Sequence, residues 1–198
     1  GYGVFPLICL LHKLGLLWDK NKDVDETTGL LEKLRDKYDT GVPVAENPAK
    51  QIARRLAGKV PVVYGGGFTA EVAHRWKTQF NENAKCWAFH EVFPELNHNA
   101  TVGFLYPEEV KDKLHVMFLR SSLMNHRLKL RYKVTAELLE KAGVGHESVE
   151  AEGESPLAQV MGMVYLGDFV SYYLAMLHGI DPSPVEVIDY LKKRLAEE

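Results

Sequence analysis

The chain has 198 residues, a length that fits one domain or one domain with an appended subdomain. Apolar residues make up 46% and charged residues 26% of the sequence, which excludes a disordered chain, a collagen-like repeat and a disulfide scaffold. The formal net charge of −3 gives no electrostatic reason to expect nucleic acid or an anionic membrane as a partner. The cysteines Cys9 and Cys86 form no CxxC pair, so we expect reduced thiols in a cytoplasmic protein.

The first 58 residues are predicted to be helical. Leucines at helical spacing over residues 4–18 indicate a mostly apolar helix that needs a large covering surface, either upstream sequence or a dimer interface. A second helix is predicted over residues 25–39. A third is predicted over residues 47–56, where Asn47 caps the start and a proline occupies the first turn.

From residue 60 onward, strands and helices alternate. Short apolar runs predict strands at residues 60–64, within 84–92, at 114–119 and, as an edge strand, at 148–152. Helices are predicted over residues 69–80, 125–142 and 156–178, and from Ser183 onward. Residues 127–133 alternate like a strand, so the start of the 125–142 helix stays open. Strands separated by single helices predict a parallel, doubly wound α/β sandwich.

Asp168 lies near the middle of the long apolar helix predicted over residues 156–178. A charge at that depth of a bilayer is expensive, so a buried core or interface helix is favoured over a membrane span.

The loop Gly65-Gly66-Gly67-Phe68-Thr69 follows the first predicted strand. Ligands of open α/β sheets bind at such places, and backbone N–H groups there can hold a phosphate. However, the loop matches neither GxGxxG nor GxxxxGK[ST], and Thr69 is its only hydroxyl. We therefore favour a tight turn whose glycines allow close packing.

No cofactor is indicated by the sequence. The eight histidines form neither an HxxxH nor an HExxH pattern, so their spacing favours no metal ion. A Ser/His/Asp triad has no GxSxG motif to support it.

Glu82 and His98 together suggest acid–base chemistry. Glu82 lies where the predicted helix 69–80 ends, and His98 lies sixteen residues later, beyond the next strand. Proton abstraction beside a carbonyl needs one base and one group that moves a proton to or from a hydroxyl. Either residue alone is more simply a surface residue, so only the pair supports this interpretation.

The stretch from Asn47 to Phe104 resembles the second half of the bifunctional phosphoglucose/phosphomannose isomerases, which belong to the sugar isomerase (SIS) superfamily. The motifs that carry this resemblance are Gly65-Gly66-Gly67, Asn81-Glu82-Asn83-Ala84-Lys85 and Glu95-Leu96-Asn97-His98-Asn99. Gly167-Asp168-Phe169 and the segment from Gly179 to Val185 resemble the family's C-terminus. The resemblance thus covers nearly the whole chain.

This resemblance implies a flavodoxin-like, three-layer α/β/α parallel sheet of the SIS type, preceded by N-terminal helices. Residues 1–58 would lead in from a missing N-terminal SIS domain, and residues 59–198 would form the C-terminal SIS domain. In the family, Ser/Thr-rich loops of the first domain anchor the sugar phosphate.

The resemblance also implies site residues. Glu82 resembles the base that moves a proton between C1 and C2 through a cis-enediol, and His98 resembles the ring-opening histidine that the family presents to the neighbouring subunit. Lys192 is matched to a lysine on the family's last helix, with Lys193 as the adjacent alternative. Ser183 is matched to a Thr/Ser position near the substrate, although it is also a good helix cap.

The implied activity is that of a cytoplasmic, metal-free aldose–ketose isomerase that works as a homodimer on glucose 6-phosphate, with mannose 6-phosphate left open. The alternative is a non-catalytic SIS domain that binds a sugar phosphate as a regulatory ligand. The Glu82–His98 pair favours the enzyme, because a sensor needs no proton shuttle. A nucleotide-binding flavodoxin-like domain is disfavoured, because the loop after the first predicted strand is neither hydroxyl-rich nor of the GxGxxG type. The 198-residue chain alone is expected to have negligible isomerase activity.

Overall fold

The computed structural model describes residues 3–197 and has a four-stranded parallel sheet at its centre, in the order β2-β1-β3-β4. The strands are β1 (Val60–Gly66), β2 (Phe89–Phe93), β3 (Leu114–Arg120) and β4 (Gly145–Glu150). In the register of the sheet, Tyr64 of β1 lies opposite Glu91 of β2 and Phe118 of β3. The predicted parallel α/β sheet is confirmed, with β4 as an edge strand.

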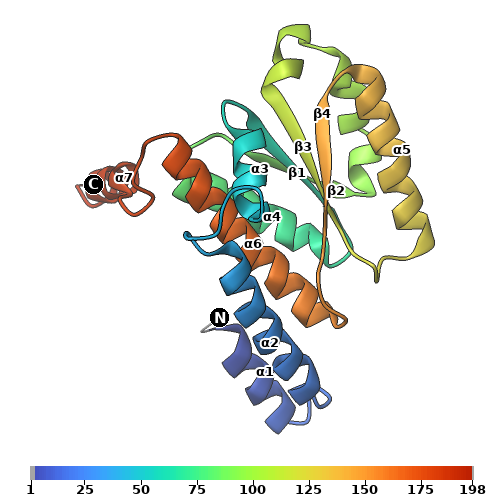
Figure 1. Cartoon of the computed structure of the whole chain (residues 1–198), viewed down its shortest axis with the longest axis vertical. Helices are drawn as coiled ribbons and strands as arrows, with labels where there is room; N and C mark the ends of the chain where they lie inside the picture. The colour runs from blue at the N-terminus through green and yellow to red at the C-terminus, as the bar shows by residue number, and fades with distance from the viewer. Residues whose placement is uncertain (1–2, 198) are drawn as a thin grey trace.

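Helices cover both faces of the sheet (Figure 1). One face is covered by α3 (Pro48–Leu56), α4 (Thr69–Asn83) and α6 (Pro156–Leu177), with α2 (Asn21–Tyr38) packed against α6. The other face is covered by α5 (His126–Ala142) and by the 3-10 segments Glu95–Asn97, Ala100–Leu105 and Glu108–Lys113. The three-layer arrangement is therefore confirmed.

Each face has its own core. On the face of α4 and α6, the fully buried Trp76 donates its indole N–H to the carbonyl of Met163 at 2.8 Å. On the face of α5, the rings of Phe93 and Tyr132 stack at 4.2 Å, and the Tyr132 hydroxyl donates to the carbonyl of Leu119 at 3.0 Å. These bonds satisfy the polar ends of large buried aromatic side chains, as buried Trp and Tyr require.

Helix α6 is long and apolar. Its length and its mean hydropathy of 1.4 would allow it to cross a membrane, but half of its most apolar window is buried inside the protein. It packs against α2, α3 and α4, so its apolar composition is accounted for by contacts within the chain.

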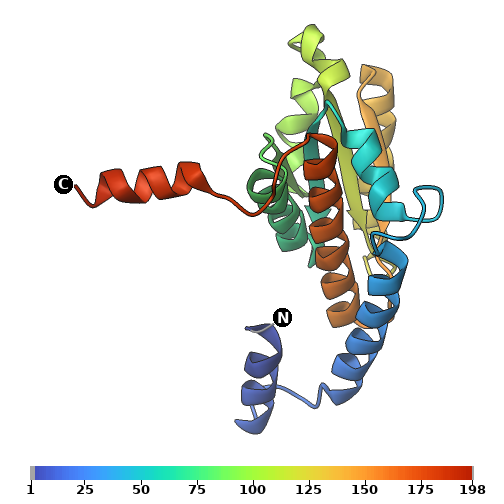
Figure 2. The same cartoon turned by 60° about the vertical axis from the view of Figure 1, so that its left-hand side comes forward.

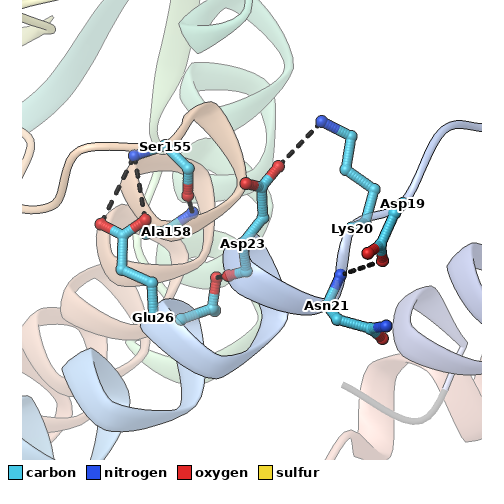
Figure 3. A network of polar contacts seen from close by, with 8 residues as sticks. Asp19, Lys20, Asn21, Asp23, Glu26, Ser155 and Ala158 are labelled. Atoms are coloured by element: carbon cyan, nitrogen blue, oxygen red, sulfur yellow. Dashed lines mark hydrogen bonds and ion pairs between the residues drawn. The ribbon is translucent and has the colours of Figure 1, made fainter.

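The start of α6 is held by two side chains (Figure 3). Ser155 is the N-cap, and its hydroxyl accepts from the N–H of Ala158 at 3.2 Å. The Glu26 carboxylate, from α2, accepts from the backbone N–H groups of Glu154 at 2.5 Å and Ser155 at 3.1 Å. These donors favour the charged form and lower the pKa of Glu26.

Two short helices lie at the periphery and bury no residue: α1 (Val4–Lys13) and α7 (Glu186–Leu195). Figure 2 shows α7 extending away from the rest of the molecule. The helix predicted over residues 4–18 is too long, because Gly15 adopts a left-handed φ of 69° that ends it.

The start of the predicted 125–142 helix, which the alternating residues 127–133 had left open, lies at His126, because the Asn125 side chain caps α5 by accepting from the N–H of Leu128 at 2.9 Å. Other predicted boundaries differ from the structure. The fourth strand begins at Gly145, which pairs with His115 of β3, rather than at residue 148. The last helix begins at Glu186 rather than at Ser183.

Candidate active site

The glycines at the carboxyl end of β1 and the turn that follows them are a packing feature. Thr69 is fully buried, and its hydroxyl oxygen accepts from the N–H of Gly66 at 3.0 Å and lies 3.2 Å from the carbonyl of Leu119. A Cβ on Gly65 would lie 2.8 Å from the carbonyl carbon of Thr69, and one on Gly66 would lie 3.0 Å from the Leu128 side chain. The structure supports the packing interpretation, because the loop's one hydroxyl is already bonded within the fold.

Glu82 lies in the last turn of α4, not after the helix as the sequence suggested. The predicted end at residue 80 is wrong because the carbonyl of Phe80 still accepts from the N–H of Ala84 at 3.1 Å. The helix ends at Asn83, and Lys85, two residues later, has a left-handed φ of 52° that cannot continue it. The Glu82 side chain is exposed at this end of the helix.

Lys85 joins the end of α4 to the loop that follows α6. Its ammonium donates to the carbonyl of Glu82 at 2.6 Å and to the carbonyl of Pro182 at 3.0 Å. The ring Nδ1 of His178 bonds the carbonyl of Ala84 at 3.1 Å and strengthens the same junction. Glu82 and the loop around Ser183 therefore lie side by side.

A groove of about 460 Å³ opens beside this junction, lined by Tyr172, Met176 and residues 179–183. Within it, the Asp181 carboxylate accepts from the N–H of Ser183 at 2.8 Å, and this bond lowers the pKa of Asp181. The groove lining thus includes a carboxylate and a hydroxyl, groups that can bond a polyhydroxylated ligand.

Ser183 does not cap the last helix. The N-cap of α7 is Val185, which makes no capping bond through its side chain. The first backbone bonds of the helix run to the carbonyl of Val185, from the N–H groups of Ile188 at 2.8 Å and Asp189 at 3.2 Å. Ser183 is exposed and lines the groove.

His98 and Glu82 lie at opposite ends of the strands: His98 at their carboxyl ends and Glu82 at their amino ends. His98 is exposed at the end of the Glu95–Asn97 turn, just after the carboxyl end of β2, whereas Glu82 precedes that strand. The five residues of β2 span about 17 Å at 3.3 Å per residue. Within one chain the structure therefore does not bring Glu82 and His98 together.

Lys192 is also apart from Glu82. It lies on α7, where it and Lys193 are both exposed. Because α7 extends away from the body (Figure 2), the structure brings neither lysine to the groove. Of the four predicted site residues, only Glu82 and Ser183 share one region.

A sequence model described as the bacterial phospho-glucose isomerase C-terminal SIS domain matches residues 45–195. The chain belongs to this family. The SIS domain is 39% identical over 198 residues to a bifunctional phosphoglucose/phosphomannose isomerase of Caldicellulosiruptor bescii, covering 100% of this chain and 58% of the relative. It is 40% identical over 197 residues to the enzyme of the same name from Thermoplasma acidophilum, and the match covers 99% of this chain and 58% of that relative.

A solved structure agrees with these relatives. A glucose-6-phosphate isomerase like protein from Thermus thermophilus superposes with a TM-score of 0.69 at 26% identity, covering 93% of this SIS domain and 59% of that chain. The resemblance to the phosphoglucose/phosphomannose isomerases inferred from the sequence is confirmed. The chain spans just under three fifths of the length of the relatives it matches.

The sequence predicted no site role for two residues of this SIS domain, Lys85 and Asp181. Lys85 stands in the same motif as Glu82, three residues later, which is the signal that could have drawn attention to it. Asp181 precedes Pro182, a combination typical of turns. Within residues 3–197, no three His, Cys, Asp or Glu side chains gather to hold a metal ion.

Proposed function

We propose that this SIS domain is the C-terminal half of a cytoplasmic isomerase that interconverts glucose 6-phosphate and fructose 6-phosphate and also accepts mannose 6-phosphate. The single observation that carries this proposal is the position of Glu82, an exposed residue whose backbone carbonyl is joined through the Lys85 ammonium to Pro182 of the groove lining, next to Ser183. The names of the curated relatives support the substrate class.

Glu82 is the general base in this proposal. Its carboxylate removes the proton from C2 of the open-chain aldose while the carbonyl oxygen on C1 gains a proton, which gives the cis-enediol. Glu82 then returns its proton to C1 as the hydroxyl on C2 loses one, so the exchange is balanced and needs no cofactor. In the described range 3–197, no donor is bonded to that carboxylate, so it is free to accept a proton. The ammonium of Lys85 holds the helix end on which Glu82 sits.

His98 opens the sugar ring in the site of a second subunit of a homodimer. The support for this arrangement is the length of β2, which separates His98 from Glu82 within one chain. Asn97, the preceding residue, is fixed on α5 by bonds to Thr135 at 2.9 Å and Arg131 at 3.0 Å, so the turn that presents His98 is well supported.

Another SIS domain supplies most of the contacts to the substrate phosphate. Two observations support this part of the proposal: Thr69 uses its hydroxyl inside the fold, and the chain covers only 58% of its curated relatives. Ser183 contacts the substrate from the groove, and Lys192 reaches the site when α7 packs against the assembled protein.

The test is Glu82→Gln in the full-length protein that contains this domain. Gln keeps the size of the side chain but cannot take the C2 proton, so kcat falls about 10²–10⁴-fold while KM changes little. The matched control is Glu95→Gln, because Glu95 is also exposed and makes only a long 3.3 Å bond to Asn99. Near-normal turnover with Glu82→Gln and a loss with Glu95→Gln would assign the base to Glu95.

His98→Asn separates the two proposed roles. It should slow the reaction less when the substrate is supplied already ring-opened, because ring opening precedes proton transfer. The regulatory alternative predicts a different result, in which the full-length protein binds hexose 6-phosphates without turnover and Glu82→Gln changes nothing. Residues 1–198 alone should show negligible isomerase activity, because remote phosphate contacts position the reacting carbons.

A further inference from the structure

Lys85 has a backbone conformation that is usually reserved for glycine. Its φ is 52°, and among the described residues 3–197 it is the only residue other than glycine in the left-handed region. That region crowds the Cβ atom of an L-residue, so glycine is preferred where a helix ends in this way, as it does at Gly143 after α5. Strained residues persist where their surroundings impose the conformation, and they cluster at functional sites. The side chain of Lys85 therefore makes contacts that a glycine could not replace.

The ammonium of Lys85 joins two separate elements. It donates to the carbonyl of Glu82 at 2.6 Å and to the carbonyl of Pro182 at 3.0 Å. The Glu82 carbonyl lies in the last turn of α4, where carbonyl groups have no partner within the helix, and a lysine close to the helix end can supply one. Pro182 belongs to the loop of residues 179–183, which lines the groove. Within residues 3–197, no other hydrogen bond links the end of α4 to this loop.

The second half of this loop has few other bonds. Its start is fixed to α6, because the N–H of Ile180 donates to the carbonyl of Ala175 at 3.1 Å. Beyond that point, Asp181 accepts from Ser183 within the loop, and the chain then enters α7, which buries no residue. The charge of Lys85 also reaches the loop: the bonds from Ser183 are the main cause of the lowered pKa of Asp181, and the ammonium adds to it. Lys85 thus holds the part of the loop that carries Ser183 to the body of the domain.

We propose that Lys85 is a positioning residue of the isomerase site, whose ammonium holds the Glu82 turn of α4 at a fixed separation from Ser183. This inference rests on the proposed function, in which Glu82 is the base and Ser183 contacts the substrate. The two residues act on one hexose phosphate only while their separation is constant, because a misplacement of about 1 Å can cost about 100-fold in rate. Lys85 itself touches no substrate in this arrangement. The need for its ammonium accounts for a lysine at an unfavourable φ.

Lys85→Gly in the full-length protein separates positioning from the simple ending of a helix. Glycine suits the left-handed φ better than lysine, so a residue that served only to end α4 could be replaced with no loss of stability or activity. Loss of the ammonium should instead lower kcat at least about tenfold with little change in KM, because most of the phosphate contacts lie elsewhere. Lys85→Met should act in the same way. Lys85→Arg should restore most of kcat, since a guanidinium can donate to both carbonyls.

Lys50→Met is the matched control. The Lys50 ammonium likewise donates to two backbone carbonyls, those of Thr40 at 2.8 Å and Val42 at 2.7 Å, in the loop before α3. Breaking this bridge should lower the melting temperature and leave kcat unchanged. Hydrogen–deuterium exchange adds a measurement that does not depend on activity: exchange over residues 179–183 should become faster in Lys85→Met and stay as in the wild type in Lys50→Met.

A double-variant cycle with Glu82→Gln completes the test. Lys85→Met should lower the kcat of the wild type but change the residual kcat of Glu82→Gln by no more than about twofold, because the base that Lys85 positions is then absent. The inference is overturned if Lys85→Gly keeps the wild-type kcat while Glu82→Gln loses it, if Lys85→Arg is no better than Lys85→Met, or if Lys50→Met lowers kcat as much. Near-normal turnover with Glu82→Gln would instead overturn the proposed function, and with it this role of Lys85.

Discussion

Gly167 sits where α6 crosses α4, and replacing it by Ala should loosen the contact that supports Glu82. A Cβ at this position would lie 2.5 Å from Gln79 Oε1, 2.6 Å from Trp76 Nε1 and 2.8 Å from Trp76 Cδ1. The Trp76 ring is fully buried and bonded to the carbonyl of Met163, so it cannot withdraw without losing that bond. The two helices must therefore move apart.

Helix propensity and steric overlap act in opposite directions on the free energy of unfolding of Gly167→Ala. Ala is more favourable than Gly inside a helix by about 1 kcal/mol. Overpacking costs about 1–3 kcal/mol, and a buried indole N–H left without its acceptor costs about 1–3 kcal/mol more. The steric terms dominate, so we expect Gly167→Ala to lower the free energy of unfolding by about 2–3 kcal/mol and the melting temperature by roughly 5–10 °C.

Chemical denaturation monitored by tryptophan fluorescence measures this effect. Gly29→Ala in α2 is the matched control, because nothing lies within 4 Å of a Cβ placed there. The control should raise the stability by up to about 1 kcal/mol. If Gly167→Ala were as stable as Gly29→Ala, α4 and α6 would have room between them, and the reasoning from these distances would be wrong.

Three further outcomes are expected. Iodoacetamide at pH 8, followed by peptide mass spectrometry, should label the exposed Cys9 and spare Cys86, because burial raises the pKa of the Cys86 thiol to about 11. Asn47→Ala should lower the free energy of unfolding by about 1–2 kcal/mol in urea titrations, since the side chain caps α3 and is fully buried. The lowered pKa of Glu26 means that its bonds to the start of α6 stabilise the protein above about pH 4.5 and are lost as the pH falls further, so the stability difference between wild type and Glu26→Gln should shrink from pH 7 to pH 3.

The central elements could be predicted from the sequence because their signals are local. The β-branched run that starts at Val60 and the Asn47-Pro48 start of α3 each contain the information that forms them. The alternating residues 127–133 left the start of the predicted 125–142 helix open, since Leu130 is apolar but lies on the exposed side of α5. Whether an apolar residue faces the core or lies at the surface is not a property of its neighbours in sequence.

The candidate site was predicted in part for a similar reason. Glu82 and His98 follow from a spacing, but spacing alone does not say that β2 carries the chain from the amino ends of the strands to their carboxyl ends between them. The contribution of Lys85 depends on Pro182, which is 97 residues away in sequence. Contacts of that range are set by the packing of α4 on α6 and have no local signal.

The bond between Lys85 and Pro182 also limits how far the last helix can travel. Only Ser183 to Val185 separate that anchor from the start of α7, a tether of about 10 Å when fully extended. Lys192 is about 10 Å further along the helix at 1.5 Å per residue. The swing of α7 therefore keeps this lysine within a radius of about 20 Å from Pro182, which includes the end of α4 that bears Glu82. A catalytic centre that used Lys192 from this same chain would have to form on that side of the sheet, and lengthening the tether by inserted glycines should weaken its delivery while leaving the fold unchanged.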